Sequence, residues 1–224
     1  MSKWLRDNRG FLLFLLLFGL FRTAVADWNP IPSGSMRPTL LEGDVVLVNR
    51  LAFDLKVPLT NAVVAHLGEP RRGDIVTFSS PRDGVRLIKR LVALPGDTVQ
   101  MRDKVLLVNG HAANYRPIGM VLEHPAPGAA VQALRLYETT GSRTHVVQWL
   151  ELPSGSGRDS FGPLVVPAGH YLMLGDNRDD SADSRYFGLV PRELLIGRAV
   201  RILVSADIEG NWTPRFARFG EALK

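Results

Sequence analysis

The chain has 224 residues, enough for one moderately large domain or two small ones with a hydrophobic core. It contains no cysteine, which excludes a disulfide framework, a thiolate nucleophile and a cysteine-based zinc or iron site. The formal net charge is +5, but lysine and arginine form no long run. We therefore expect a solvated basic surface that favours membrane headgroups and no nucleic-acid partner.

The N-terminal segment combines a basic start, the apolar run of residues 11–21 and an A-x-A sequence ending at Ala26. These are the parts of a cleaved secretory signal, but a short retained anchor is the alternative. As a helix up to Ala26, the apolar segment would span ~24 Å of a ~30 Å hydrocarbon core, so Arg22 would have to snorkel to the surface. We expect residues 1–27 to be a cytoplasmic start and a retained transmembrane anchor, with the rest exported.

Beyond this segment the chain consists of short, β-branched stretches separated by Gly, Pro and Asp, which is typical of strands. The pair Asn109-Gly110 predicts a tight hairpin turn. We therefore predict a mainly β fold behind an N-terminal membrane helix. The predicted parts are an antiparallel β-sheet core (28–97 and 166–215), an inserted β-rich second lobe (98–165) and a C-terminal tail (216–224).

The tetrapeptide PSGS occurs twice, at residues 32–35 and 153–156. The first copy runs into an apolar, β-branched stretch, whereas the second continues into a mixture of Gly, Ser and Arg. A nucleophile needs rigid support, so Ser35 in the first copy is the better candidate. We interpret the second copy as a flexible loop.

A serine hydroxyl needs a base to become a nucleophile at neutral pH. A triad of Ser35, His170 and Asp176 is conceivable, but the residues around His170 indicate only a turn before a strand. Lys89 lies in VRLIKRLVAL, where strand alternation can carry its side chain to an apolar face. Burial there would lower the pKa of the amine from ~10.4 and make it a base. The alternative is that Lys89 extends into solvent from an edge strand.

A third stretch, GDNRDDSADSRYFG at residues 175–188, is dense in Asp and Arg. It does not fit a calcium loop, because the alternation of acidic residues breaks at Arg178 and the twelfth position is Phe187. An ion-pair network fits better. Such a network could hold a loop rigid while it presents Ser181 or Ser184 to another polar group.

Four motifs in order, IPSGSMRPTL, RRGDIVTFSSP, LIKRLVALPGD and GDNRDDSADSR, resemble the successive motifs of the bacterial type I signal peptidases, or leader peptidases. The similarity covers residues 31–97 and 166–204. It implies a Ser/Lys dyad with Ser35 as nucleophile and Lys89 as general base. Leu87 departs from the pattern, because many relatives carry an aromatic residue two places before the lysine.

The resemblance also implies roles for further residues. Ser33 would complete the oxyanion hole with the backbone N–H of Ser35, and Ser181 would hydrogen-bond the lysine amine. The loop would be stabilised by ion pairs of Asp183, Arg185 and Arg178. The shallow pockets for small side chains would be formed near Ile31, Pro32, Met36 and Ile88.

The activity that the resemblance implies is a membrane-bound serine endopeptidase that cleaves signal peptides from exported preproteins through an acyl-enzyme. Its partners would be preprotein signal peptides and membrane lipid, with no metal or other cofactor. It would be a single-pass protein of the cytoplasmic membrane with its catalytic part on the exported side. One alternative is a self-cleaving repressor-type peptidase, which would need a DNA-binding domain in place of the apolar segment. Another is an inactive, anchored β-domain that binds exported chains.

Overall fold

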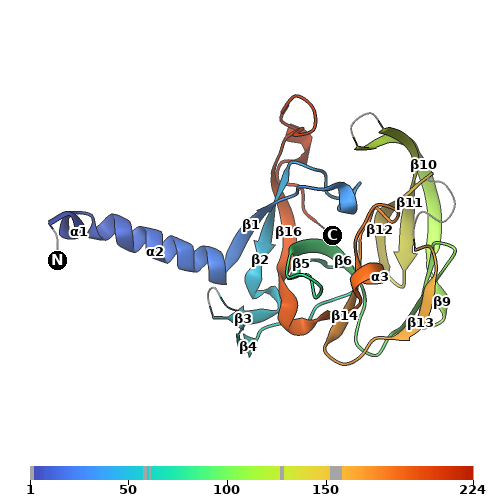
Figure 1. Ribbon diagram of the computed structural model, residues 1–224, viewed down its shortest axis with the longest axis horizontal. Helices are drawn as coiled ribbons and strands as arrows, with labels where there is room; N and C mark the ends of the chain where they lie inside the picture. The colour runs from blue at the N-terminus through green and yellow to red at the C-terminus, as the bar shows by residue number, and fades with distance from the viewer. Residues whose placement is uncertain (1–2, 58–59, 61, 127–128, 152–157, 224) are drawn as a thin grey trace.

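The computed structural model describes residues 3–57, 60, 62–126, 129–151 and 158–223. Its central feature is a seven-stranded antiparallel sheet. The strands follow the order β1 (Ala26–Pro30), β2 (Asp44–Asn49), β16 (Leu195–Ser205), β5 (Ile75–Ser79), β6 (Arg86–Ala93), β14 (His170–Leu174) and β15 (Val190–Pro191). β16 comes late in the chain yet lies between β2 and β5, so both halves of the sequence complete one sheet (Figure 1).

Three smaller antiparallel sheets accompany the central one. They consist of β10 (Asn114–Ala126), β11 (Ala129–Thr140) and β12 (Arg143–Leu150); of β13 (Phe161–Val165), β7 (Thr98–Arg102), β8 (Val105–Val108) and β9 (His111–Ala112); and of β3 (Asp54–Lys56) and β4 (Val63–His66). The predicted hairpin at Asn109-Gly110 is confirmed, because both residues have positive φ and connect β8 to β9. The prediction of a mainly β fold is confirmed as well. The second PSGS copy lies outside the described residues.

The side chains of β6 alternate between two hydrophobic clusters that lie on opposite faces of the strand. Leu87 and Leu91 pack into one cluster, whereas Ile88 packs against another. Lys89 shares the face of Leu87 and Leu91, because successive side chains of a strand point to opposite faces. β6 is also paired on both sides, with β5 and with β14, so Lys89 does not lie on an edge strand.

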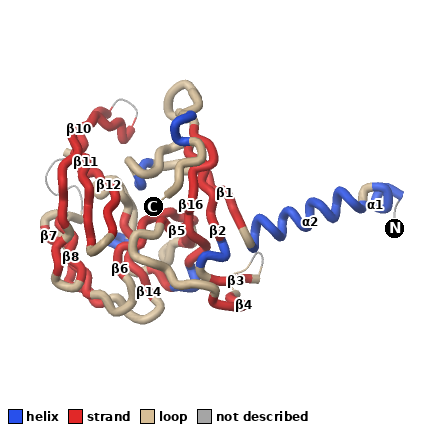
Figure 2. Tube along the Cα trace, turned by 180° about the vertical axis from the view of Figure 1, so that it is seen from behind, coloured by secondary structure: helices blue, strands red, loops and turns tan. Residues whose placement is uncertain are grey.

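The N-terminal residues form the helices α1 (Lys3–Asp7) and α2 (Arg9–Ala24). α2 projects away from the sheets, at the end of the molecule opposite to β10, β11 and β12 (Figures 1 and 2). Within the described residues, no helix combines the length and the apolar character that crossing a membrane requires. The transmembrane helix expected from the sequence is therefore not confirmed.

The physical reason for this short helix lies at its C-terminal end. Immediately after α2 the chain turns into β1, and Arg22 Nε donates a hydrogen bond of 3.0 Å to Asp27 Oδ1. The Arg22 guanidinium also lies 4.3 Å from the centre of the Trp28 ring, which contacts Phe18. The remaining helical segments are the short helix α3 (Ser184–Phe187) and the 3-10 turns η1 (Gly34–Met36), η2 (Arg50–Ala52), η3 (Arg192–Leu194) and η4 (Phe216–Arg218).

Candidate active site

Ser35 lies in the 3-10 turn η1. This turn begins directly after Ser33, whose backbone is extended. Met36, its neighbour in the turn, is fully buried, and its carbonyl accepts a hydrogen bond from the backbone N–H of Leu40. The apolar side chain of Met36 thus fixes the turn in the core, while Ser35 itself remains partly exposed. This is the rigid support that a nucleophile requires.

Lys89 points from β6 to this turn. Its side chain is buried, and Nζ forms a hydrogen bond of 2.6 Å with Ser35 Oγ. The alternative of a solvent-exposed lysine is therefore wrong. Burial lowers the pKa of Lys89 from 10.5 to about 8, although Asp183, Asp176 and Asp180 oppose the shift by favouring the ammonium.

The loop that follows β14 holds the serine turn in place. The backbone N–H of Asn177 donates to the Ser35 carbonyl over 3.2 Å, and its Nδ2 donates to the Gly34 carbonyl over 3.1 Å. Gly175 approaches the turn so closely that a Cβ at this position would lie 2.4 Å from the Ser35 carbonyl oxygen. Only glycine fits there without a shift of the backbone. Asn177 could not be singled out in the sequence, because an asparagine in a polar loop is common.

Asp183 and Arg185 form the ion pair that the resemblance implies. Arg185 Nη2 and Nε each lie 2.8 Å from an oxygen of Asp183. Asp183 also caps α3 and accepts a hydrogen bond of 3.0 Å from the backbone N–H of Gly175. This carboxylate therefore joins the start of α3 to the glycine that contacts the serine turn.

Arg178 also forms an ion pair, but with a carboxylate outside its own loop. Its guanidinium pairs with Glu138 of β11 over 2.7 Å, and both side chains are buried. Burial alone would raise the pKa of Glu138, but Arg178 and His145 hold it below its ordinary value, so the carboxylate stays charged. Glu138 is 40 residues away from Arg178 in the sequence and lies in a segment without a recognisable motif.

The two serines expected to assist catalysis differ in burial. Ser33 is exposed, whereas Ser181 is buried. The hydrogen bond expected between Ser181 and the Lys89 amine is not formed, since Oγ of Ser181 has no hydrogen-bond partner among the described residues. Ser181 is nevertheless adjacent to the site, because its Oγ would lie 2.2 Å from a Cβ placed on Gly175.

Asp176 takes part in a buried ion pair that the sequence did not reveal. Both of its oxygens bind Arg90, at 2.8 and 2.7 Å, and Thr39 donates a further hydrogen bond. His170 lies on β14, where its Nδ1 contacts the carbonyl of Ala168. The alternative triad of Ser35, His170 and Asp176 is therefore wrong, because Asp176 and His170 have other partners.

The residues expected to form the substrate pockets separate into two groups. Ile31 and Met36 are buried in one cluster, and the partly buried Ile88 packs against it. Pro32 is exposed between Ile31 and the serine turn. The structure thus brings three apolar side chains together beside Ser35 and leaves the fourth at the surface.

A serine hydroxyl in contact with a buried lysine of lowered pKa is the nucleophile and base arrangement of a serine hydrolase. The family model described as signal peptidase, peptidase S26, matches residues 3–204. The chain belongs to this family. It is a membrane-associated serine peptidase that removes signal peptides from exported preproteins.

Two named bacterial relatives, at 35% and 32% identity, agree with this assignment. The chain is 35% identical over 225 residues to "Signal peptidase I" of Pseudomonas aeruginosa, covering 93% of this chain and 75% of the relative. It is 32% identical over 230 residues to "Signal peptidase I" of Aquifex aeolicus, covering 88% and 83%. A solved signal peptidase I from Enterococcus faecalis is 32% identical, covers 58% of this chain and 96% of that chain, and has a TM-score of 0.34.

Proposed function

We propose that Ser35 and Lys89 form the catalytic dyad. The observation that carries this proposal is the 2.6 Å contact between a buried amine and a partly exposed hydroxyl. The neutral Lys89 amine accepts the proton of Ser35 Oγ as this oxygen attacks the scissile carbonyl. The ammonium then donates the proton to the leaving amine, which leaves an acyl-enzyme. Lys89 next takes a proton from water, the hydroxide attacks the ester, and Ser35 regains its proton.

The negatively charged oxygen of the tetrahedral intermediate must be stabilised by hydrogen-bond donors. We assign this role to the hydroxyl of Ser33 and the backbone N–H of Ser35. The position of Ser33 supports this role, because the residue immediately precedes η1 and its side chain is exposed. Its hydroxyl forms no hydrogen bond with a described residue, so it is available to substrate. A donor that acts mainly on the developing oxyanion accelerates the chemical step more than it strengthens substrate binding.

Selectivity for small residues at the first and third positions before the cut is assigned to the apolar side chains beside Ser35. Ile31, Met36 and Ile88 form part of one packed cluster, so a larger substrate side chain could enter only by displacing them. Pro32 lies at the surface, where it can border an extended substrate. Preproteins with an A-x-A sequence before the cut fit these requirements.

We assign the remaining residues of the loop a supporting role. Asp183 and Arg185 hold Gly175 and α3, and Ser181 approaches Gly175, the residue that contacts the serine turn. The division of the chain into a catalytic core (28–97 and 166–215), an inserted lobe (98–165) and a tail (216–224) belongs to the same proposal. It is supported by the central sheet, whose strands come from the two core ranges apart from the first two residues of β1, Ala26 and Asp27.

We also propose that the N-terminal segment is retained and holds the catalytic part at the exported face of the cytoplasmic membrane. Exposed apolar side chains surround α2, as expected for a helix in contact with lipid. The A-x-A sequence that ends at Ala26 is protected because Ala26 pairs with Asn49 in β1 and β2. Intact-mass measurement on protein from membranes tests this proposal, and a soluble chain that begins at Asp27 would contradict it.

The cleavage reaction is tested with the detergent-solubilised protein and a purified preprotein. We expect a new N-terminus directly after the A-x-A sequence, and no product with Ser35→Ala or Lys89→Arg. Lys89→Arg should be inactive because a guanidinium cannot serve as a base. Lys104→Arg is the matched control and should keep its activity, because Lys104 pairs with Asp179 and is not part of the proposed dyad. Binding of the preprotein without cleavage by the wild-type protein would instead support the inactive binding domain. An alanine to leucine change at the first or third position of the substrate should block cleavage.

A further inference from the structure

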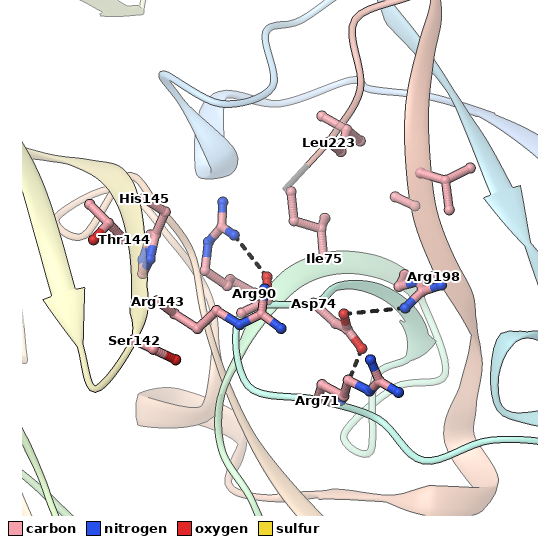
Figure 3. A pocket seen from close by; sticks show the side chains of 13 residues that line it. Arg71, Asp74, Ile75, Arg90, Ser142, Arg143, Thr144, His145, Arg198 and Leu223 are labelled. Atoms are coloured by element: carbon pink, nitrogen blue, oxygen red, sulfur yellow. Dashed lines mark hydrogen bonds and ion pairs between the residues drawn. The ribbon is translucent and has the colours of Figure 1, made fainter.

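A cavity of about 500 Å³ is lined by residues of the central sheet and of the three-stranded sheet, and neither Ser35 nor Lys89 lines it. Four arginine side chains border it together with a single acidic residue, Asp74 (Figure 3). They are Arg71 before β5, Arg90 on β6, Arg143 on β12 and Arg198 on β16. Arginines from four separate chain segments therefore converge on one space.

The charges around this cavity do not balance. Arg90 is paired with Asp176, and Arg198 lies 3.6 Å from Asp74. The guanidinium groups of Arg71 and Arg143 have no hydrogen bond or ion pair with any described residue. Within the part of the chain that the structure describes, two positive charges therefore face the cavity without a carboxylate to neutralise them. Like charges that share a partly enclosed space repel each other, and an anion would remove this cost.

A histidine at the same cavity also lacks a hydrogen-bond partner. The side chain of His145 is only 10% exposed, and neither ring nitrogen forms a hydrogen bond within the described part of the chain. Nε2 lies 3.4 Å from Glu138 and 4.0 Å from Asp176. Nδ1 has no comparable neighbour, so it can accept or donate a hydrogen bond to a ligand.

Arg143 is held over the cavity by packing. It extends from the start of β12 across Gly73, where a Cβ would lie 3.7 Å from its Cδ atom, an ordinary contact distance. Figure 3 shows the Arg143 side chain reaching from β12 toward Asp74 and Arg90. The cationic wall is thus built jointly by the central and the three-stranded sheet.

We propose that this cavity binds a phosphate group, either as a free anion or as part of a phosphate ester. A phosphate carries up to two negative charges, which matches the two unpaired guanidinium groups, whereas a carboxylate neutralises only one. Its oxygens can also accept hydrogen bonds from guanidinium groups that approach from different directions. Ser142 and Thr144 line the same cavity and add neutral donors. This site is separate from the proposed catalytic dyad and does not depend on it.

Isothermal titration of the full chain in detergent with inorganic phosphate and with glycerol 3-phosphate tests the proposal, at an ionic strength held constant with sodium chloride. We expect saturable binding, weakened about tenfold or more by Arg143→Gln or Arg71→Gln, because each removes a charge-assisted hydrogen bond. Arg82→Gln is the matched control. It removes the same charge from an exposed turn and should leave binding unchanged.

Thermal unfolding separates a binding defect from a folding defect. In phosphate-free buffer, Arg143→Gln should unfold at a temperature no lower than the wild type, because it breaks no hydrogen bond or ion pair with a described residue and relieves repulsion. Added phosphate should raise the unfolding temperature of the wild type and of Arg82→Gln more than that of Arg143→Gln. An equal rise in all three proteins would overturn the proposal.

The source of the phosphate group is decided by a vesicle experiment. Binding to vesicles that contain phosphatidic acid, a phosphate monoester, would identify a lipid headgroup if it exceeds binding to phosphatidylcholine vesicles and is reduced by Arg143→Gln but not by Arg82→Gln. Saturable binding of glycerol 3-phosphate without such a vesicle effect would identify a soluble phosphate ester. The proposal is overturned if the wild type shows no saturable binding of any of these probes, or if Arg82→Gln weakens binding as much as Arg143→Gln.

Discussion

The lowered pKa of Lys89 predicts how activity depends on pH. With a pKa of about 8, roughly one tenth of the amine is neutral at pH 7. A lysine that kept the ordinary value of 10.5 would be neutral to only about 0.03%. Burial therefore raises the concentration of the base about 300-fold at neutral pH. We expect kcat/KM to rise about tenfold per pH unit below pH 8 and to reach a plateau above it.

The same shift predicts a change in stability, whose sign follows from proton linkage. The amine has a lower pKa in the folded chain than in the unfolded chain, so stability rises with pH between about 8 and 10.5. Below pH 8 the buried ammonium costs about 3 kcal/mol. Lys89→Met removes this cost. The stability of Lys89→Met relative to the wild type should therefore fall by about 2.5 kcal/mol between pH 7 and pH 10.

Two measurements check this prediction. Cleavage of a peptide substrate is followed from pH 6 to pH 10, with Lys89→Arg as the inactive control, and urea unfolding of the wild type and Lys89→Met is compared over the same range. A flat rate profile between pH 6 and pH 8 would refute the assignment of Lys89 as the base. A profile that still rises steeply above pH 9, or a stability difference independent of pH, would refute the lowered pKa.

Three further substitutions test the contacts around the site. Ser33→Ala should lower kcat by about 10²–10³ with little change in KM, and a raised KM at unchanged kcat would make it a binding residue. Gly175→Ala should abolish turnover, since its Cβ would lie 2.4 Å from the Ser35 carbonyl oxygen, and wild-type kinetics would contradict this. Glu138→Gln should cost about 3–5 kcal/mol in urea unfolding by leaving Arg178 buried without a counter-charge. Combining Glu138→Gln with Arg178→Met should recover part of that loss, and a purely additive loss would argue against the pair.

Local patterns in the sequence predicted the strands but not their arrangement. The alternation along β6 and the turn at Asn109-Gly110 depend on neighbouring residues, so they are visible in the sequence. The insertion of β16 between β2 and β5 depends on burial between segments more than 100 residues apart. The transmembrane expectation was not confirmed because hydrophobic composition does not show where a helix ends. Here the chain enters β1 soon after Ala24.

The same distinction applies to the site. Ser35 and Lys89 could be proposed as partners because each lies in a motif of the family that the sequence resembles, whereas the local setting alone left a solvent-exposed lysine as an alternative. The partner of Arg178 could not be predicted, since the nearest acid in the sequence, Asp179, instead binds Lys104 and the backbone of Leu150. Which carboxylate an arginine meets is decided by the packing of separate sheets, and a single sequence contains no direct record of that packing.

The three-stranded sheet has no motif of its own, yet it fixes the position of the serine turn. The backbone of Gln148 on β12 bonds Asp176 and Arg178 at 2.9 and 3.0 Å, and Asn177 between them holds the Ser35 carbonyl. A buried ion pair such as Arg178 with Glu138 is stable only while both partners are in place, because either charge alone is costly to bury. Docking of β11 and β12 therefore adds to the support that the buried Met36 gives the serine turn. Changes that loosen these strands should act on catalysis through Asn177 and the serine turn.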